Sequence, residues 1–319
     1  MKPLAGMRIV DFTSMIAGPY CTRLLADCGA EVLKIEEPHG DHMRMRPPMR
    51  AGHSTYFGHL NAGKKSVVLD LKSTDGRDAA QRLVAASDVV VENFRPGVMK
   101  RLGLDYAALA AAKPDLVYCS ISGFGQTGPR AAQPAYAPVV HAASGFDHTQ
   151  FIYQDDQEKP AKTGIFVADV LAAVYAFGAV QTALIGRLRH GTGQFIDVAL
   201  MDSMINLLVF ECQEAQFPEK SRRPLYVPMR ARDGFVIVAP VNQRNFEQLA
   251  DAVGHPEWKA DPQLAARGSL ATVTDDAGAF LVPNPPFQFA DSSVGVAPTV
   301  PALGSHTEAV LEEFLGRKQ

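Results

Sequence analysis

The sequence predicts an α/β protein, with a large Rossmann-like domain on a parallel sheet and a small second domain. Short apolar runs of strand length alternate with helical segments through the first 121 residues. This alternation is typical of a parallel sheet with helices on both faces. The chain of 319 residues is also longer than a single core usually serves, so we expect more than one domain.

Each element is predicted from its own stretch of sequence. The predicted strands are Arg8–Thr13, Glu31–Glu36, Ser66–Leu71, Asp88–Glu92 and Leu116–Ile121. Helices are predicted over 17–28, where Gly29 provides the C-terminal stop, and over 76–86. A turn and strand over 191–198 lead into an apolar helix that ends at Phe210.

Asp169 stands directly before a long apolar run, Val170–Val180. A carboxylate in such a place is costly unless it is paired, hydrogen-bonded or used. One interpretation is a helix N-cap that accepts from the backbone of Leu171 or Ala172. The other is a reactive group. Gln181 interrupts the apolar segment, which predicts a buried core helix rather than a membrane span.

Composition excludes several classes of function. The net charge of −3 leaves no electrostatic footprint for nucleic acid. The four cysteines form no zinc-type spacing, so no metal site is predicted, and their apolar surroundings are typical of a reducing compartment. The first residues lack the apolar segment of a signal peptide. We therefore expect a cytoplasmic protein without a membrane partner.

Three loops follow predicted strands: 14–19, 93–97 and 122–129. All contain glycine or proline, which suits a backbone that turns close to a ligand. Ligands of open parallel sheets bind beyond the carboxyl ends of the strands. None of these loops carries the dinucleotide fingerprint or a Walker A sequence, which disfavours a Rossmann dehydrogenase.

Several short motifs, taken in their order and spacing, resemble class III CoA-transferases. The stretches are 6–13 with 17–19, 29–36, 40–41 with Arg44, 61–72, 92–97 with 101–104, 122–129, Asp169 and 191–197. This family includes formyl-CoA and carnitine CoA-transferases, with alpha-methylacyl-CoA racemases as relatives. The resemblance runs from Gly6 to about Pro262 and resumes over 261–268.

The resemblance implies that Asp169 is the catalytic nucleophile. Its carboxylate would form a mixed anhydride with the donor acyl group and then an aspartyl-CoA thioester, before CoA passes to an acceptor acid. Covalent catalysis divides one difficult exchange into easier steps, and apolar surroundings keep water from the anhydride. Coenzyme A is then a co-substrate, and no permanently bound cofactor is expected.

The resemblance also implies which residues bind the substrates. The implied CoA-binding residues are Met15, Ile16, Ala17, Arg44, Lys72, Asn93, Phe94, Arg95 and Arg101. The residues expected to line the acyl pocket are Gly123, Gly125, Tyr136 and His141. Arginine can bind phosphate oxygens in a forked geometry, but Arg44 and Lys72 are equally well explained as solvated surface cations. Phe94 is also explained as a core residue.

Two departures from the family pattern bear on the chemistry. Ile16 stands where relatives often have a polar residue, which removes a hydrogen bond from the active site. Tyr136 stands where the racemase branch places its catalytic histidine, which favours transfer over racemisation. An acyl-CoA racemase or isomerase, and an inactive CoA-binding remnant, remain alternatives.

The resemblance implies that the small second domain is truncated. Relatives usually carry several dozen residues between segments that here fuse at Asp261-Pro262. The predicted division is 1–220 for the first part of the large CoA-binding domain, 221–262 for the small domain and 263–319 for a segment returning to the large domain. A strand over 233–239 and helices over 245–253 and 307–315 are expected. The expected partners are acyl-CoA, small carboxylates and a second copy of the chain, with interlocking of the dimer left open.

Overall fold

The computed structural model describes residues 2–153, 159, 163–217, 227–230, 232–238, 247, 250–251, 254, 270–275 and 278–283. The chain divides into two compact units, Met1–Pro218 and Glu219–Gln319. The first unit contains the central sheet and all the predicted site residues.

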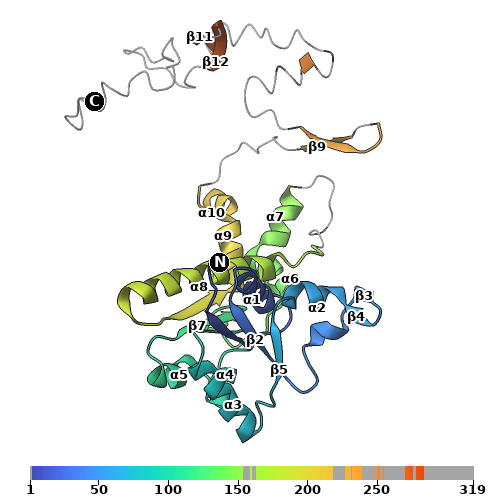
Figure 1. Ribbon diagram of the computed structural model, residues 1–319. Helices are drawn as coiled ribbons and strands as arrows, with labels where there is room; N and C mark the ends of the chain where they lie inside the picture. Colours follow the sequence, from blue (N-terminus) through green and yellow to red (C-terminus); the bar gives the residue numbers. More distant parts are fainter. Residues whose placement is uncertain are drawn as a thin grey trace, which may run out of the picture. The chain divides into compact units, whose positions relative to one another are not determined.

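A six-stranded parallel sheet forms the centre of the first unit (Figure 1). Its strands are β1 (Arg8–Asp11), β2 (Glu31–Glu36), β5 (Lys65–Val68), β6 (Val89–Glu92), β7 (Val117–Ser122) and β8 (Phe195–Ala199). They lie in the order β5-β2-β1-β6-β7-β8, and every pair is parallel. The order reverses between β1 and β6, which is where ligands of such sheets bind. The predicted α/β class is confirmed.

Two strands end earlier than predicted because side chains turn the backbone. After Asp11, the backbone N–H and the hydroxyl of Thr13 both donate to the Asp11 carboxylate, at 2.8 and 2.5 Å. After β5, the backbone N–H of Lys72 donates to the Asp70 carboxylate at 3.0 Å. Such local bonds offer the chain an alternative to the sheet ladder.

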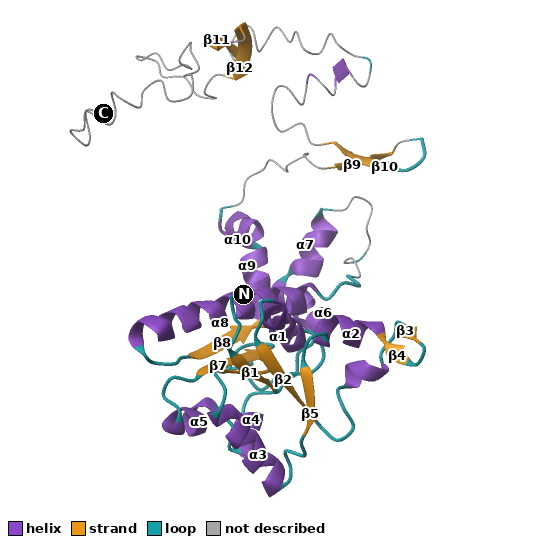
Figure 2. Ribbon diagram, viewed as in Figure 1, coloured by secondary structure: helices purple, strands orange, loops and turns teal. Residues whose placement is uncertain are grey.

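Helices cover both faces of the sheet, as predicted (Figure 2). One face carries α1 (Ala17–Asp27) and α8 (Val167–His190), and the other carries α3 (Thr74–Ala85), α4 (Val98–Leu102) and α5 (Tyr106–Ala112). Neighbouring residues of a strand face opposite sides. Ile9 therefore joins the core beneath α1 and α8, whereas Val10 joins the core beneath α3.

Helix α8 has 24 residues and is long and apolar enough, by length and composition, to cross a membrane. Its buried side packs into the core of the sheet, as predicted. Small side chains dominate that side, including Ala168, Ala172, Ala173 and Ala176. They allow the helix backbone to lie close to the strands.

The first unit also contains elements that were not predicted from the sequence or that have other bounds than predicted. They are the 3₁₀ helix η1 (His42–Met45), β3 (Met49–Arg50), β4 (His53–Ser54), α2 (Thr55–Asn61), α6 (Ala137–Ser144), α7 (Phe146–Ile152), α9 (Leu200–Leu207) and α10 (Val209–Gln216). The prediction of one apolar helix up to Phe210 was wrong. Leu208 leaves helical geometry, with φ −90° and ψ 31°, and so divides the segment into α9 and α10.

The second unit contains two antiparallel strand pairs among its described residues. These are β9 (Val227–Arg230) with β10 (Phe235–Val238), and β11 (Leu270–Asp275) with β12 (Gly278–Pro283). The strand predicted over 233–239 is thereby confirmed. The boundaries predicted at 220 and 262 stay predictions, and the helix over 307–315 and most of the helix over 245–253 lie outside the described residues.

Candidate active site

The loops after β1, β6 and β7 meet at the carboxyl edge of the sheet and enclose a cavity of about 490 Å³. It is lined by Ser14, Met15, Ala17, His42, Arg46, Asn93, Phe94, Arg95, Pro96, Ile121, Ser122, Gly123, Ala131, Gln133, Pro134, Ala135, Tyr136, Asp169 and Leu200. The cavity lies where the strand order reverses, and the loops around it are those that the sequence singles out.

Asp169 reaches the cavity from the first turn of α8. Its interpretation as the N-cap is wrong, because α8 begins at Val167 and its N-cap is Phe166, without a side-chain capping bond. Burial raises the pKa of Asp169 from 3.8 to about 6. Among the described residues, no hydrogen bond or ion pair to its carboxylate offsets this burial. A carboxylate so weakly solvated is suited to attack an electrophile.

His141 supports the start of α8 instead of lining the cavity. The backbone N–H of Ala168 donates to His141 Nε2 at 3.1 Å. The proton of the neutral ring is then on Nδ1, which is buried without a partner among the described residues. Burial also lowers the pKa of His141. The neutral ring of His141 therefore caps the backbone N–H of Ala168, the residue directly before Asp169.

Tyr56 lies close enough to Asp169 for an electrostatic effect. Burial is the main reason that the pKa of Tyr56 is raised, and the charge of Asp169 raises it further. Tyr56 belongs to α2, more than a hundred residues before Asp169. Nothing in the sequence pattern indicated this proximity.

The loop between β1 and α1 has a demanding backbone. Met15 lines the cavity with φ at 67°, a left-handed conformation that is uncommon outside glycine. A Cβ atom on Gly18 would lie 2.3 Å from Thr13 Cβ, so only glycine fits there. Ile16 is buried in a small core with Met43 and lies outside the cavity lining.

Asn93 joins this loop to the loop after β6. Its side chain accepts from Ser14 N at 2.9 Å and donates to Ser14 O at 2.8 Å. Phe94 lines the cavity and also packs against the core beneath α3, so both predictions for it fit its position. Arg95 lines the cavity with an exposed side chain.

Three predicted CoA-binding cations lie outside the lining. Arg44 makes two bonds to the carboxylate of the buried Glu36, at 2.7 and 2.6 Å, and covers the ring of Phe57 at 4.0 Å. Lys72 and Arg101 are exposed. Their predicted roles remain predictions. The cavity itself brings in Arg46 and His42, which the sequence did not mark as CoA ligands.

The remaining predicted residues divide between the wall and its support. Gly123 lines the cavity, and a Cβ atom there would lie 2.1 Å from Ala135 Cβ. Tyr136 lines it with 63% of its surface exposed. Gly125 is buried outside the lining, with φ at 87°, and lies against the Asp197 carboxylate.

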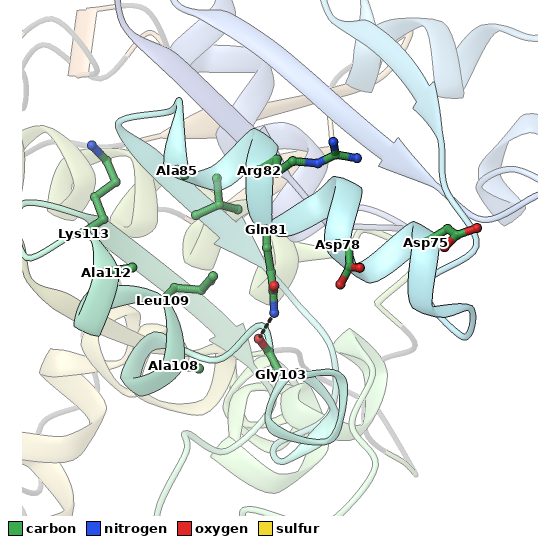
Figure 3. A pocket seen from close by; sticks show the side chains of 11 residues that line it. Asp75, Asp78, Gln81, Arg82, Ala85, Gly103, Ala108, Leu109, Ala112 and Lys113 are labelled. Carbon is green, nitrogen blue, oxygen red and sulfur yellow. Dashed lines mark hydrogen bonds between the residues drawn. The ribbon is translucent and has the colours of Figure 1, made fainter.

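A larger cavity of about 730 Å³ lies between α3 and α5 (Figure 3). Gln81 Nε2 donates to Gly103 O there, at 3.2 Å. None of the predicted site residues lines this cavity. The smaller cavity, which contains Asp169, is therefore the candidate active site.

Comparison with known proteins agrees with this geometry. The family model described as CoA-transferase family III matches residues 4–269. The chain is 36% identical to the succinate–glutarate CoA-transferase of Agrobacterium fabrum, over 79% of this chain and 66% of the relative. It is 38% identical to the acetyl-CoA:oxalate CoA-transferase of Acetobacter aceti, over 82% of this chain and 69% of the relative. The alignment thus covers slightly less than two thirds of the Agrobacterium relative.

Solved structures show the same fold. A CAIB/BAIF family protein from Brucella suis superposes with a TM-score of 0.71 at 30% identity, covering 98% of this chain and 99% of that chain. A hypothetical protein from Mycobacterium tuberculosis superposes with a TM-score of 0.75 at 31% identity, covering 83% and 72%.

Proposed function

The chain belongs to CoA-transferase family III, and on that premise we propose that it moves CoA from an acyl-CoA to a carboxylic acid, with Asp169 as the nucleophile. One observation carries the proposal. Asp169 is a poorly solvated carboxylate, unpartnered among the described residues, in the cavity at the reversal of strand order. CoA enters as a co-substrate.

In the first half of the reaction, the Asp169 carboxylate attacks the thioester carbonyl of the donor. The C–S bond breaks, which leaves a mixed anhydride on Asp169 and CoA as the thiolate. The backbone N–H groups of Ala17 and Gly18 begin α1 without a side-chain cap. We assign the oxyanion of the tetrahedral intermediate to this helix start. The thiolate then attacks the aspartyl carbonyl, which releases the donor acid and forms the aspartyl-CoA thioester.

In the second half, the acceptor carboxylate attacks the aspartyl thioester and releases the thiolate again. The thiolate attacks the acyl carbonyl of the acceptor, forms the new acyl-CoA and regenerates the Asp169 carboxylate. Every step exchanges one activated acyl group for another, so the cycle requires no external energy source. Water is the competing nucleophile, and the burial of Asp169 in the cavity limits its access.

Intact-protein mass spectrometry tests the nucleophile. Incubation with acyl-CoA donors and no acceptor should add the mass of CoA minus one water to the wild type. Asp169→Ala should show no adduct. Asp202→Ala, which removes an exposed acidic residue from the first turn of α9, should label like the wild type. A folded wild type that gains no adduct from any donor would contradict the proposal.

We further propose that the acceptor is a dicarboxylic acid whose second carboxylate binds Arg46. Arg46 lines the cavity and has no ion pair among the described residues. Of its neighbours, Arg44 is occupied by Glu36 and Arg50 lies outside the lining. The names of the relatives, with succinate, glutarate and oxalate, support a dicarboxylic substrate.

Matched acceptors test this assignment. Succinate and butyrate have four carbons each and differ in the second carboxylate. Arg46→Gln should lower kcat/KM for succinate by roughly tenfold to a hundredfold, since bonds to charged groups contribute about 1.5–3 kcal/mol. It should leave butyrate unchanged. Arg50→Gln is the control, and equal losses for both acids with Arg46→Gln would contradict the assignment.

Two alternatives predict different observations. A racemase or isomerase would exchange deuterium from solvent into the α-carbon of an acyl-CoA without an acceptor acid. An inactive remnant would bind CoA without turnover.

The cytoplasmic location expected from the sequence is also part of this proposal, and cell fractionation tests it.

We propose that the protein is a homodimer. Helix α8 carries exposed apolar residues on the side away from the sheet: Val170, Val174, Ile185 and Leu188, each at least 41% exposed. Their spacing places them on one face of the helix. Light scattering should give a dimer for the wild type and a monomer for the Val174→Glu/Leu188→Glu variant. A folded wild-type monomer would contradict the proposal.

A further inference from the structure

A buried ion pair joins two walls of the cavity. Lys34 Nζ lies 3.0 Å from Asp41 Oδ2, and each side chain is only 2% exposed. Lys34 belongs to β2 and Asp41 is the N-cap of η1. Neither residue lines the cavity, so neither is placed to touch a substrate in it.

The first wall is the loop after β1. Lys34 Nζ donates to Thr13 O at 2.9 Å, and Met15 N donates to Asp41 Oδ1 at 3.4 Å. Met15 has the left-handed backbone described above, with φ at 67°. Such a residue keeps its conformation only when its surroundings hold it. Here the ion pair supplies one contact two residues before the strained residue, at Thr13 O, and a second at the backbone N–H of Met15 itself.

The second wall is η1 with the residues that follow it. Asp41 Oδ1 accepts from Met43 N at 2.9 Å, which starts the 3₁₀ turn. The backbone N–H of Asp41 donates to Glu36 Oε2 at 3.0 Å. This turn presents His42 and Arg46 to the cavity. Asp41 therefore contacts the backbone of both walls through one carboxylate oxygen.

Stability alone does not explain a charged pair at this place. Removing two charges from water is costly, and apolar residues of similar size often serve a core equally well. What an apolar pair cannot provide is the set of directed bonds to Thr13, Met15 and Met43.

We propose that Lys34 and Asp41 form a positioning pair for CoA transfer. The inference rests on the proposed function. The pair fixes the loop that contacts the acyl-CoA relative to the turn that carries Arg46, so that donor and acceptor meet Asp169 in the same geometry. Its loss lets the walls move apart while the sheet stays intact.

Paired variants test this without leaving one buried charge unpaired. Lys34→Met/Asp41→Leu should keep a cooperative melting transition close to that of the wild type. Hydrogen exchange should become faster in peptides covering 13–17 and 41–46, and remain unchanged in the strands. The value of kcat/KM should fall roughly tenfold to a hundredfold for both donor and acceptor, because small misplacements cost that much.

A second variant separates the two walls. Lys34→Met/Asp41→Asn keeps a side-chain oxygen that can cap η1 but loses the bond to Thr13 O. Exchange over 41–46 should return toward the wild-type rate, whereas exchange over 13–17 should recover less, because Met15 N keeps its acceptor but Thr13 O has lost Lys34. This milder variant also serves if the Leu variant does not fold.

The control is an ion pair at the opposite edge of the sheet. Arg187 Nη2 lies 3.0 Å from Asp88 Oδ1, before the start of β6. Arg187→Met/Asp88→Leu should leave kcat/KM and exchange over 13–17 unchanged. The proposal is overturned if Lys34→Met/Asp41→Leu keeps wild-type exchange in both walls, or opens them with wild-type kcat/KM. A wild type that transfers no CoA would refute the proposed function, whereas exchange would still decide whether the pair holds the walls.

Discussion

Replacing Asp169 with asparagine should stabilise the protein while abolishing transfer. The pKa of Asp169 is about 6 in the folded protein, against an ordinary value of 3.8. One pKa unit corresponds to about 1.36 kcal/mol, so ionising this buried side chain costs the folded state about 3 kcal/mol. Asparagine has nearly the same shape and carries no charge, so Asp169→Asn avoids that cost.

The gain should depend on pH with a definite sign. Because the pKa is higher in the folded state, the penalty is complete above pH 6 and disappears below the ordinary value of 3.8. At pH 7.5 the variant should gain about 3 kcal/mol, or roughly 6–12 °C in the melting temperature of a unit this large. At pH 5 about half of the gain should remain.

Urea and thermal unfolding between pH 4.5 and 8, followed by far-ultraviolet circular dichroism, measures this gain. Slower hydrogen exchange of the α8 amides in the variant would show that the gain in stability belongs to the first unit, which contains this helix. The control is Asp75→Asn, which removes an exposed acidic residue from the first turn of α3. That variant should lose about 0.3–1 kcal/mol of favourable dipole interaction instead. A variant at Asp169 that is no more stable than wild type at pH 7.5, or equally stabilised at every pH, would refute the reasoning.

Three further predictions follow from the same site. The rate of adduct formation should fall tenfold per pH unit below the Asp169 pKa of about 6. Stopped-flow mixing over a pH series measures this rate, and a rate that does not change with pH would exclude this carboxylate as the nucleophile. Gly18→Ala places a Cβ atom 2.3 Å from Thr13 Cβ, so it should lower both the melting temperature and the affinity for CoA. Calorimetry measures CoA binding, and an unchanged affinity would contradict the proposed tight fit. His141→Ala leaves the Ala168 N–H without its acceptor and should cost about 1–3 kcal/mol in urea unfolding, whereas His141→Gln should lose less if the side-chain acceptor is what matters.

Much of the first unit was predictable because its signals are local. A strand such as Glu31–Glu36 is bounded by a glycine before it and a turn after it, and the structure has the same bounds. The alternation of strands and helices implied a parallel sheet, and the sheet then brought three loops to one edge. The place of the candidate site follows from this topology.

The features that the sequence did not indicate depend on side-chain contacts. Asp169 was one candidate for the N-cap of α8. In the structure Phe166 occupies the N-cap position, and His141 accepts the hydrogen bond from the backbone N–H of Ala168. Arg44 was predicted to bind CoA or to be a solvated surface cation, and the structure adds its bond to Glu36, which the sequence did not indicate; its role in CoA binding stays a prediction. In both cases the partner comes from another element, so no local pattern identifies it.

The sequence by itself determined the sheet and the family, and it singled out the carboxylate that we propose as the nucleophile, because periodicity and motif spacing are properties of neighbouring residues. Only the tertiary structure decided which groups surround that carboxylate. It brought Tyr56 near Asp169 and set Arg46 in the same cavity. It also tied Lys34 to Asp41 beneath the loop of Met15. These relations depend on distances across folded elements and on burial, which raises the pKa of Asp169 only once the chain has excluded water around it.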